Sequence, residues 1–391
     1  MKEGWTYKKL GEVCDYSIGL TYKPTDVCDN GTIVLRSSNI QNGQIDLNDI
    51  VRVSCPIKDS LFVNKGDILM CSRNGSARLV GKVAIIPDIK ERMTYGTFMM
   101  IIRSDYNPFL FYYFNSDIFR KQIKHGEANM INQITRYMLD DVVVSLPPLS
   151  DQQRIVSRLD AAFSHIDELK ANAEKQLTEA RALFQKSLDK AMEPKEGWKV
   201  KTLKEIGITQ TGTTPSKSEV SNYGDFIPFI RPSEIDCDGC GSIDYNSEIK
   251  LSEKGLKNGR LFKKQSILMV CIGATIGKVG YCTQDVSCNQ QINVLTPIKD
   301  SYKFIYYAMR NKDFNDKVIK GGTSAQATLP IINKGKWEAM TISLPPLSEQ
   351  QRIVERLDAL SAHVRELEEI QKKIISECDA LKQALLRKVF E

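Results

Sequence analysis

The sequence predicts an α+β protein in which two similar globular domains are separated by two long helices that form an antiparallel coiled coil with pseudo-twofold symmetry. The chain has 391 residues, more than one domain usually holds. Residues 144–193 recur without a gap as residues 342–391, and both copies have the apolar spacing that is typical of a coiled coil. We expect a first domain at 1–149, a central helix at 150–193, a second domain at 194–347 and a C-terminal helix at 348–391.

The repeated segment contains the same three runs in both copies. They are Ser-Leu-Pro-Pro-Leu-Ser, Gln-Gln-Arg-Ile-Val and Arg-Leu-Asp, at 145–150, 152–156 and 158–160 and again at 343–348, 350–354 and 356–358. A shorter repeat, Lys-Glu-Gly-Trp, stands at 2–5 and at 195–198. Glu391 aligns with Glu193, just before the second copy of this run, so the end of the chain lines up with its own beginning. We therefore expect the two termini to lie close together.

Each repeated segment has the features of a long helix. Ser150 with Gln153, and Ser348 with Gln351, have the spacing of a helix-capping box behind two prolines. Apolar residues then follow at steps of four and three, which keeps one side of the helix facing a partner helix. The first helix leads from domain one to domain two, so a second helix packed on it must run back. The expected contact positions are Ile155, Leu159, Ile166, Leu169, Ile353, Leu357, Leu360, Val364, Leu367 and Ile374.

The two domains differ more than the helices, but they share an order of features. Short runs rich in β-branched residues alternate with Gly, Asn and Asp turns, and Asn42-Gly43 and Asp238-Gly239 mark hairpins at equivalent places. A helix is expected after these runs in each domain, at 108–124 and at 302–320, followed by a glycine-bearing polar loop. Each domain is therefore predicted to be α+β, with a mainly antiparallel, irregular sheet.

Composition and charge exclude some classes of protein. No run of apolar residues is long enough to span a membrane, and the first residues lack the apolar core of an export signal, so we expect a cytoplasmic protein. The 10 cysteines are scattered, which favours free thiols. The net charge of the chain is +6. Domain one (1–149) carries +2 and domain two (194–347) carries +6, while each repeated helix carries −1. This distribution is compatible with an anionic partner such as nucleic acid.

Catalytic and cofactor motifs are largely missing. The glycines before Lys82 and Lys278 lack the spacing and the Ser/Thr of a phosphate loop. Cys237 and Cys240 could form half of a zinc site with Cys282 and Cys288, but they also flank an Asp-Gly turn, and we favour the turn. His165 and His363 are repeat mates on the helices and are expected to be ordinary helix residues. The Leu-Pro-Pro-Leu runs lack the polar and aromatic residues that flank the two prolines of adenine methyltransferases. We therefore expect a chain without catalytic activity, cofactor or metal of its own.

The repeated Leu-Pro-Pro-Leu-Ser and Gln-Gln-Arg-Ile-Val segments, which alternate with two dissimilar domains over the whole chain, closely resemble the specificity subunit of type I restriction-modification enzymes. This resemblance implies that each domain recognises one half of a bipartite DNA target. It also implies that the helices set the spacing and dock two modification subunits, which use S-adenosylmethionine to methylate adenine. Restriction subunits that use ATP and magnesium would complete the enzyme in a prokaryotic cytoplasm.

Candidate DNA contacts are basic and amide or hydroxyl side chains in the domain loops. They are Tyr22, Lys23, Arg36, Arg73, Arg78, Lys82, Asn129 and Gln133 in domain one, and Thr214, Lys217, Arg231, Lys278, Thr323, Ser324 and Gln326 in domain two. Arg36 and Arg231 recur at equivalent places and could equally be structural. Candidate docking residues for the modification subunits lie at the helix starts: Gln152, Gln153, Arg154, Gln350, Gln351 and Arg352.

The sequence leaves two other functional hypotheses open. One is a coiled-coil scaffold that tethers proteins without reading DNA. The other is a self-contained DNA methyltransferase or nuclease, which the missing motifs make less favourable.

The repeat makes a testable prediction about chain connectivity. A circularly permuted chain that begins near Lys195 and joins residue 391 to residue 1 should still fold, because each repeat would keep its neighbours. Soluble expression and a cooperative unfolding transition would support this expectation, and an insoluble or inactive permutant would count against it.

Overall fold

The computed structural model describes residues 4–124, 133–235, 241, 243–246, 249–322 and 330–391. The chain forms two compact units, and each combines one globular domain with one end of each long helix. Unit 1 consists of Met1–Asn172 and Ile374–Glu391, whereas unit 2 is the continuous segment Ala173–Lys373. The expected boundaries, at 1–149, 150–193, 194–347 and 348–391, separate the long helices from the domains. The two units instead divide each long helix between them.

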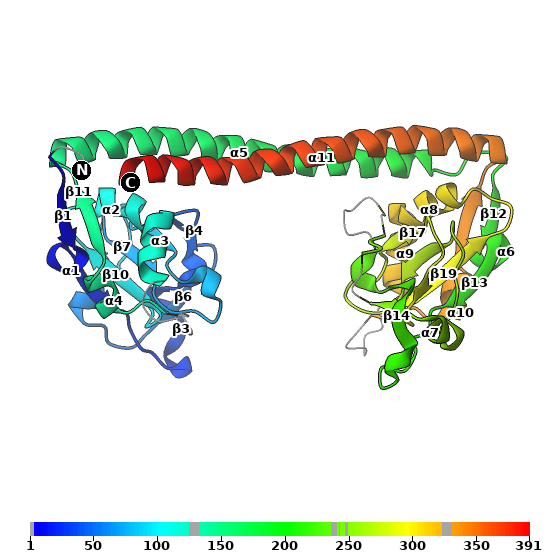
Figure 1. The fold of residues 1–391 in the computed structure, drawn as a ribbon, viewed down its shortest axis with the longest axis horizontal. Coiled ribbons are helices and arrows are strands. Elements are labelled where there is room, and N and C mark those ends of the chain that lie inside the picture. The colour runs from blue at the N-terminus through cyan, green and yellow to red at the C-terminus, as the bar shows by residue number, and fades with distance from the viewer. Residues whose placement is uncertain (1–3, 125–132, 236–240, 242, 247–248, 323–329) are drawn as a thin grey trace. The chain divides into compact units, whose positions relative to one another are not determined.

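Unit 1 contains an antiparallel four-stranded sheet and smaller sheets around it (Figure 1). The four strands have the order β2 (Asp15–Ile18), β10 (Met99–Arg103), β7 (Ile68–Cys71) and β8 (Val83–Ile85). The remaining strands form a sheet of β6 (Val51–Val53), β3 (Val27–Leu35) and β9 (Met93–Tyr95), a hairpin of β4 (Ile40–Gln41) and β5 (Gln44–Ile45), and a pair of β1 (Thr6–Lys9) and β11 (Val143–Leu146). The predicted turn at Asn42-Gly43 joins β4 to β5, and both residues have positive φ, as this tight turn requires.

Unit 2 repeats this topology. Its four-stranded sheet has the order β13 (Gly207–Thr211), β19 (Ile292–Pro297), β16 (Ile267–Val270) and β17 (Val279–Tyr281). The remaining strands form a sheet of β15 (Lys250–Leu251), β14 (Tyr223–Ile230) and β18 (Ser287–Cys288), and a pair of β12 (Lys199–Thr202) and β20 (Thr341–Leu344). The predicted α+β class with mainly antiparallel sheets is therefore confirmed. The second predicted hairpin, at Asp238-Gly239, lies outside the described residues.

The prediction of a single helix in each domain, at 108–124 and at 302–320, is wrong, because the structure has two helices in each of these segments. Unit 1 has α2 (Asn107–Phe114) and α3 (Asp117–Lys124), and unit 2 has α8 (Tyr302–Arg310) and α9 (Lys312–Gly322). In unit 1, Ser116 donates to the carbonyl of Tyr113 at 2.6 Å and accepts from the amide of Phe119 at 3.3 Å. In unit 2, Asn311 accepts from the amides of residues 313 and 314. These polar residues cap a new helix, and the apolar pattern on either side does not reveal the break.

Short helices complete the domains. They are α1 (Leu10–Val13) and α4 (Arg136–Asp140) in unit 1, and α6 (Leu203–Ile206), α7 (Glu253–Asn258) and α10 (Lys334–Glu338) in unit 2. Polar side chains cap four of them at the N-terminus: Thr135, Thr202, Ser252 and Asn333 each accept a hydrogen bond from an amide in the first turn.

The two long helices are α5 (Leu149–Ala191) and α11 (Leu347–Phe390). The predicted capping boxes are wrong, because each helix begins one residue before its serine. Instead, the Gln152 side chain donates to the carbonyl of Pro147 at 2.8 Å, and Gln350 donates to the carbonyl of Pro345 at 3.0 Å. The proline that precedes each helix removes a backbone donor, and the glutamine satisfies a carbonyl left outside the helix.

Helices α5 and α11 pair in antiparallel orientation within each unit (Figure 1). In unit 1, Lys170 Nζ lies 2.8 Å from Asp379 Oδ1, and Lys382 pairs with Asp167. In unit 2, Arg181 Nε lies 2.7 Å from Glu368 Oε1, and Gln371 donates to Gln176 at 2.9 Å. Residue numbers rise along one helix as they fall along the other, which confirms the predicted antiparallel pairing.

The predicted contact positions are only partly buried. Leu159, Ile166, Ile353, Leu357 and Val364 are buried, and Ile155, Leu360 and Ile374 are half-buried. The prediction is wrong for Leu169, which is 54% exposed, and for Leu367, which is 36% exposed. A pair of two helices covers only one narrow stripe of each partner, so the second apolar position of the heptad lies at its edge.

The core of unit 1 includes residues from both long helices. Leu159 of α5 and Leu386 and Phe390 of α11 belong to the same buried cluster as the sheet residues Ile68 and Ile102. The Phe109 ring lies between the rings of Trp5, at 6.2 Å, and Phe390, at 5.1 Å. Residues near the two ends of the chain therefore pack against the same side chain, in line with the expectation from the repeat.

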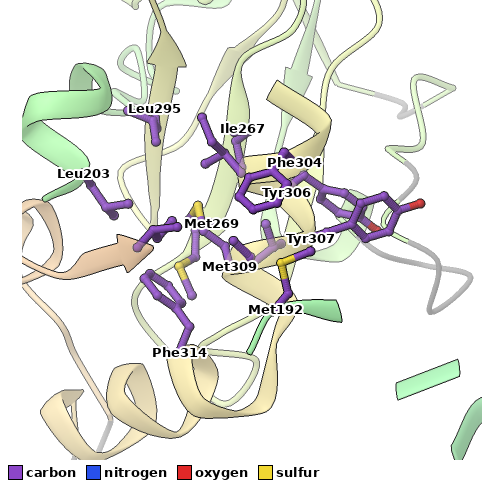
Figure 2. Packing of buried hydrophobic residues seen from close by; sticks show 14 of the residues in the cluster. Met192, Leu203, Ile267, Met269, Leu295, Phe304, Tyr306, Tyr307, Met309 and Phe314 are labelled. Carbon is purple, nitrogen blue, oxygen red and sulfur yellow. The ribbon is translucent and has the colours of Figure 1, made fainter. Parts of the chain in front are cut away.

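Unit 2 closes its core in the same way. Phe184 and Leu188 of α5, and Met192 just after its last residue, join Ile353 and Leu357 of α11 in one cluster with the strands and helices of the domain. Figure 2 shows part of this cluster, in which Met192 lies near the aromatic rings of α8. Trp198 packs on Phe304 at 6.0 Å, as Trp5 packs on Phe109 in unit 1.

A hydrogen bond that occurs in both units attaches each domain to a long helix and explains the repeated Arg-Leu-Asp run. Tyr112 of α2 donates to Asp160 of α5, and Tyr307 of α8 donates to Asp358 of α11 at 2.7 Å. Burial raises the pKa of both tyrosines, and the neighbouring carboxylate raises it further. The hydroxyls therefore remain protonated donors, and the leucine before each aspartate anchors the helix in the core.

Because residues of α11 complete the core of unit 1, Leu386→Ala should destabilise that unit by about 2–5 kcal/mol through the cavity it leaves. Hydrogen exchange should accelerate in β7 and β10. The matched variant Leu188→Ala removes the equivalent side chain from unit 2 and should instead accelerate exchange in β16 and β19. Equal acceleration in both units from either variant would show that the two cores are not separate.

Candidate nucleic-acid interface

The register of the four-stranded sheet in unit 1 gathers several loops at one edge. Ile18 of β2 pairs with Met100, and Cys71 of β7 pairs with Met99, at the start of β10. Met70 pairs with Val83, at the start of β8. The loops that follow β2 and β7 and those that precede β10 and β8 therefore meet. We call residues 19–23, 72–82, 96–98 and 133 the loop edge of domain one.

Arg73 and Gln133 are brought together at this edge from positions 60 residues apart. Their backbones form an isolated antiparallel bridge, and Arg73 Nε donates to Gln133 Oε1 at 3.0 Å, with a second bond from Nη2 to the same oxygen. Arg73 is exposed despite these contacts. A guanidinium has five N–H donors, so three remain for an external acceptor while the amide fixes the orientation of the group.

Other predicted residues of domain one have structural partners. Arg36 Nη2 forms an ion pair with Asp49 at 2.8 Å, and Lys82 Nζ donates to the carbonyl of Ile40 at 2.9 Å. These two side chains stabilise the domain. Lys23 and Arg78 are exposed, and Tyr22 is half-buried.

The equivalent edge of unit 2 has different side chains. Register places residues 212–217, 271–278, 289–291 and 331 together, and we call them the loop edge of domain two. The backbone bridge that Arg73 and Gln133 form in domain one is made here by Ile272 and Ile331. Ile331 is 49% exposed. The same backbone contact thus presents an arginine and a glutamine in one domain and two isoleucines in the other.

The predicted residues of domain two divide in a similar way. Thr214 donates to Gln290, and Lys217 is exposed. Arg231 Nη2 lies 2.6 Å from Glu234 Oε1, so this arginine, like Arg36, has a structural carboxylate partner. Lys278 is half-buried at the start of β17. The candidates Asn129, Thr323, Ser324 and Gln326 lie outside the described residues.

Sequence reasoning missed three residues at these edges. Phe98 is 55% exposed and its carbonyl accepts from the amide of Arg73 at 3.0 Å. Asn74 donates to Ser37 at 3.1 Å and ties the loop after β7 to the end of β3. Gln290 is the partner of Thr214. Asn74 lies next to the candidate Arg73, which was a signal for it, but nothing local marks Phe98 or Gln290, and only the strand register shows which loops meet.

The cysteines of domain two that the structure describes are buried: Cys271, Cys282 and Cys288. Burial raises the pKa of Cys271 and of Cys282 to about 12, so both are protonated thiols at neutral pH. Cys282 Sγ contacts the carbonyls of Lys263 and Ser266, both at 3.3 Å. Cys237 and Cys240 lie outside the described residues. In the part of the chain that is described, no group of three or more His, Cys, Asp or Glu side chains could hold a metal ion. Within the same residues, no helix is both long and apolar enough to cross a membrane.

The starts of the long helices present a second matched surface. Gln152 and Gln350 are buried and bonded within their units, so they are unavailable to a partner protein. The neighbouring side chains are exposed at both helix starts: Gln153, Arg154, Gln351 and Arg352. The leucines that open the two helices are 60% and 49% exposed, at Leu149 and Leu347. We call these six exposed residues the helix-start surfaces.

Curated relatives match the chain over almost its full length. The EcoKI specificity subunit of Escherichia coli (strain K12) is 25% identical over 430 residues, which cover 100% of this chain and 89% of the relative. The StySPI specificity subunit of Salmonella potsdam is 24% identical over 418 residues, with 100% and 89% covered. Both relatives are described as subunits of type I restriction enzymes.

Solved structures share the fold. A chain from a study of complex assembly and conformational transition in the type I R-M system has a TM-score of 0.74 at 21% identity, and the match covers 100% of this chain and 98% of that chain. The HsdS subunit from Thermoanaerobacter tengcongensis has a TM-score of 0.52 at 21% identity, with 100% and 97% covered. The profile of the type I restriction modification DNA specificity domain matches twice, at residues 2–179 and 195–376. The chain therefore belongs to this family and carries two of its specificity domains.

Proposed function

We propose that this chain reads the DNA target for a type I restriction-modification enzyme, with each domain recognising one half of a bipartite sequence. The observation that carries the proposal is the loop edge, which the same backbone builds twice with different side chains. Arg73 and Gln133 stand in domain one where Ile272 and Ile331 stand in domain two. A conserved scaffold with exchanged edge residues supports two readers of different sequence.

The side chains favour different bases at the equivalent place. An arginine that an amide holds in position can bind the O6 and N7 of guanine in the major groove. Exposed isoleucine offers an apolar contact for the methyl group of thymine, and Thr214 with Gln290 supplies polar contacts nearby. Lys23 and Lys217 are exposed at the loop edges and would neutralise phosphates.

The long helices would set the distance between the two readers. Helices α5 and α11 contain 43 and 44 residues, which corresponds to about 65 Å at 1.5 Å per residue. Half-sites in successive major grooves are about 34 Å apart, so helices of this length can span more than one turn of DNA.

The helix-start surfaces would dock the modification subunits. Exposed leucine, glutamine and arginine occur in the same order at both helix starts, so one kind of partner could bind twice. The chain itself would be non-catalytic. S-adenosylmethionine would bind to the modification subunits, and ATP with magnesium to the restriction subunits.

Sequencing of methylated adenines in strains with and without this chain tests the proposal. We expect methylation at one asymmetric, bipartite motif that disappears when the chain is deleted. An unchanged methylation pattern would favour the hypothesis that the chain is a coiled-coil scaffold that does not read DNA. Methyl transfer by the purified chain alone would show that it is an enzyme.

Arg73→Ala should weaken DNA binding by the assembled complex by about 1–3 kcal/mol and relax specificity at one position of one half-site. Ile272→Ala is the matched variant and should affect only the other half-site. Lys23→Ala, at an expected phosphate contact, should instead reduce the salt dependence of binding for all sequences. Binding measured against salt concentration and against single-base variants of the target separates these effects. Unchanged affinity and specificity for Arg73→Ala would remove this residue from the interface.

A further inference from the structure

The repeat allows contacts between α5 and α11 to be compared in pairs. With an offset of 198 residues, Lys170 is equivalent to Glu368, and Arg181 is equivalent to Asp379. The Lys170–Asp379 contact of unit 1 and the Arg181–Glu368 contact of unit 2 are therefore one contact made twice. In both places α5 supplies the cation and α11 supplies the anion.

This arrangement matters for pairings that the chain does not use. Two α5 helices in the same antiparallel register would place Lys170 opposite Arg181. Two α11 helices would place Glu368 opposite Asp379. The Glu368 side chain is only 5% exposed, so its carboxylate would lose Arg181 and face another carboxylate instead.

A second charged contact favours the same choice. Asp167 and Lys382 pair in unit 1, and their repeat equivalents are Arg365 and Phe184. A pair of α11 helices would bring Lys382 opposite Arg365, again with like charges. A pair of α5 helices would bring Asp167 opposite Phe184, and the carboxylate would lose its cation.

A polar contact adds geometric selectivity. Gln371 is 5% exposed, and its amide donates to Gln176 at 2.9 Å. The repeat equivalents of Gln371 and Gln176 are Ala173 and Ile374. In a pair of α11 helices the buried amide of Gln371 would face Ile374 and lose its partner. Single polar residues at buried coiled-coil positions are known to select the partner helix at some cost in stability.

We propose that these contacts form a pairing code by which α5 accepts α11 and rejects a second copy of either helix. The code joins two different domains and discriminates against two copies of the same domain. It acts through repulsion in the wrong pairs as well as attraction in the right one. This inference concerns helix pairing alone and does not depend on DNA recognition.

A cut form of the full-length protein tests the code. Residues 193–197 are exposed and lie outside the helices and strands, so a specific protease site can be inserted there and cleaved after folding. The cut protein is unfolded in denaturant and refolded so that the fragments can exchange partners, and native mass spectrometry then distinguishes mixed pairs of the two fragments from pairs of identical fragments. Random pairing would give about half mixed pairs, and we expect more than about nine-tenths from the native sequence.

Charge exchange provides the decisive variants. R181E/E368K keeps opposite charges in the native contact but also makes both identical pairings complementary at this site. It should raise the share of identical pairs several-fold. K170E/D379K should do the same at the other site. The variant with all four substitutions makes α5 acidic and α11 basic at both of these contacts, so it should restore the preference for mixed pairs.

Random pairing of the native fragments, or equal selectivity in all variants, would overturn the proposal. If the cut protein aggregates, thermal unfolding of the uncut chain replaces the measurement. K170E should then lower the unfolding midpoint, and adding D379K should recover it. Failure to recover would also overturn the proposal, because the contact would then contribute nothing.

Discussion

Neither globular domain closes its hydrophobic core with its own segment of the chain. The strands and short helices of each domain leave an apolar face that both long helices cover, through Leu159, Leu386 and Phe390 in one unit and through Leu188 and Leu357 in the other. Burial of these side chains fixes each domain to its helix pair. The Tyr112–Asp160 and Tyr307–Asp358 hydrogen bonds, which are directional, also constrain the orientation of each domain on its helix. This packing holds each sheet against the helix pair, while the strand register decides which loops meet at the edge of the sheet.

The duplicated architecture separates what must stay constant from what can vary. The helices retain Leu159 and Leu357, which enter the cores, and Asp160 and Asp358, which attach the domains, and this explains why Arg-Leu-Asp occurs in both copies. Internal contacts of the domains vary more. Arg103 and Asp67 form an ion pair at 3.0 Å in unit 1, and the hydroxyls of Ser266 and Thr296 meet at 2.7 Å at the equivalent place in unit 2. The scaffold tolerates such exchanges because each pair satisfies its own polar atoms.

The sequence allowed the architecture to be predicted because the repeat carries long-range information. The offset of 198 residues, the two helices and their antiparallel direction follow from the printed residues alone. The sequence did not predict details that depend on competition between local interactions. The helix breaks at Ser116 and Asn311 arise from side-chain capping inside an apolar pattern. The exposure of Leu169 arises because only one partner helix is present. Of the candidate site, the sequence identified Arg73 and Gln133 separately. Their contact depends on a backbone bridge between residues 60 positions apart, which no local pattern encodes.

The division of the chain also affects the order in which it can fold during synthesis. Unit 2 is continuous in sequence, whereas unit 1 requires residues 374–391 in addition to the first 172. The ribosome releases every residue of unit 2 before it releases those that complete unit 1. The domain that is translated first is therefore the last to become whole, and its apolar face must remain uncovered while more than half of the polypeptide is still being made. Until residues 374–391 have been made, that face is open to aggregation.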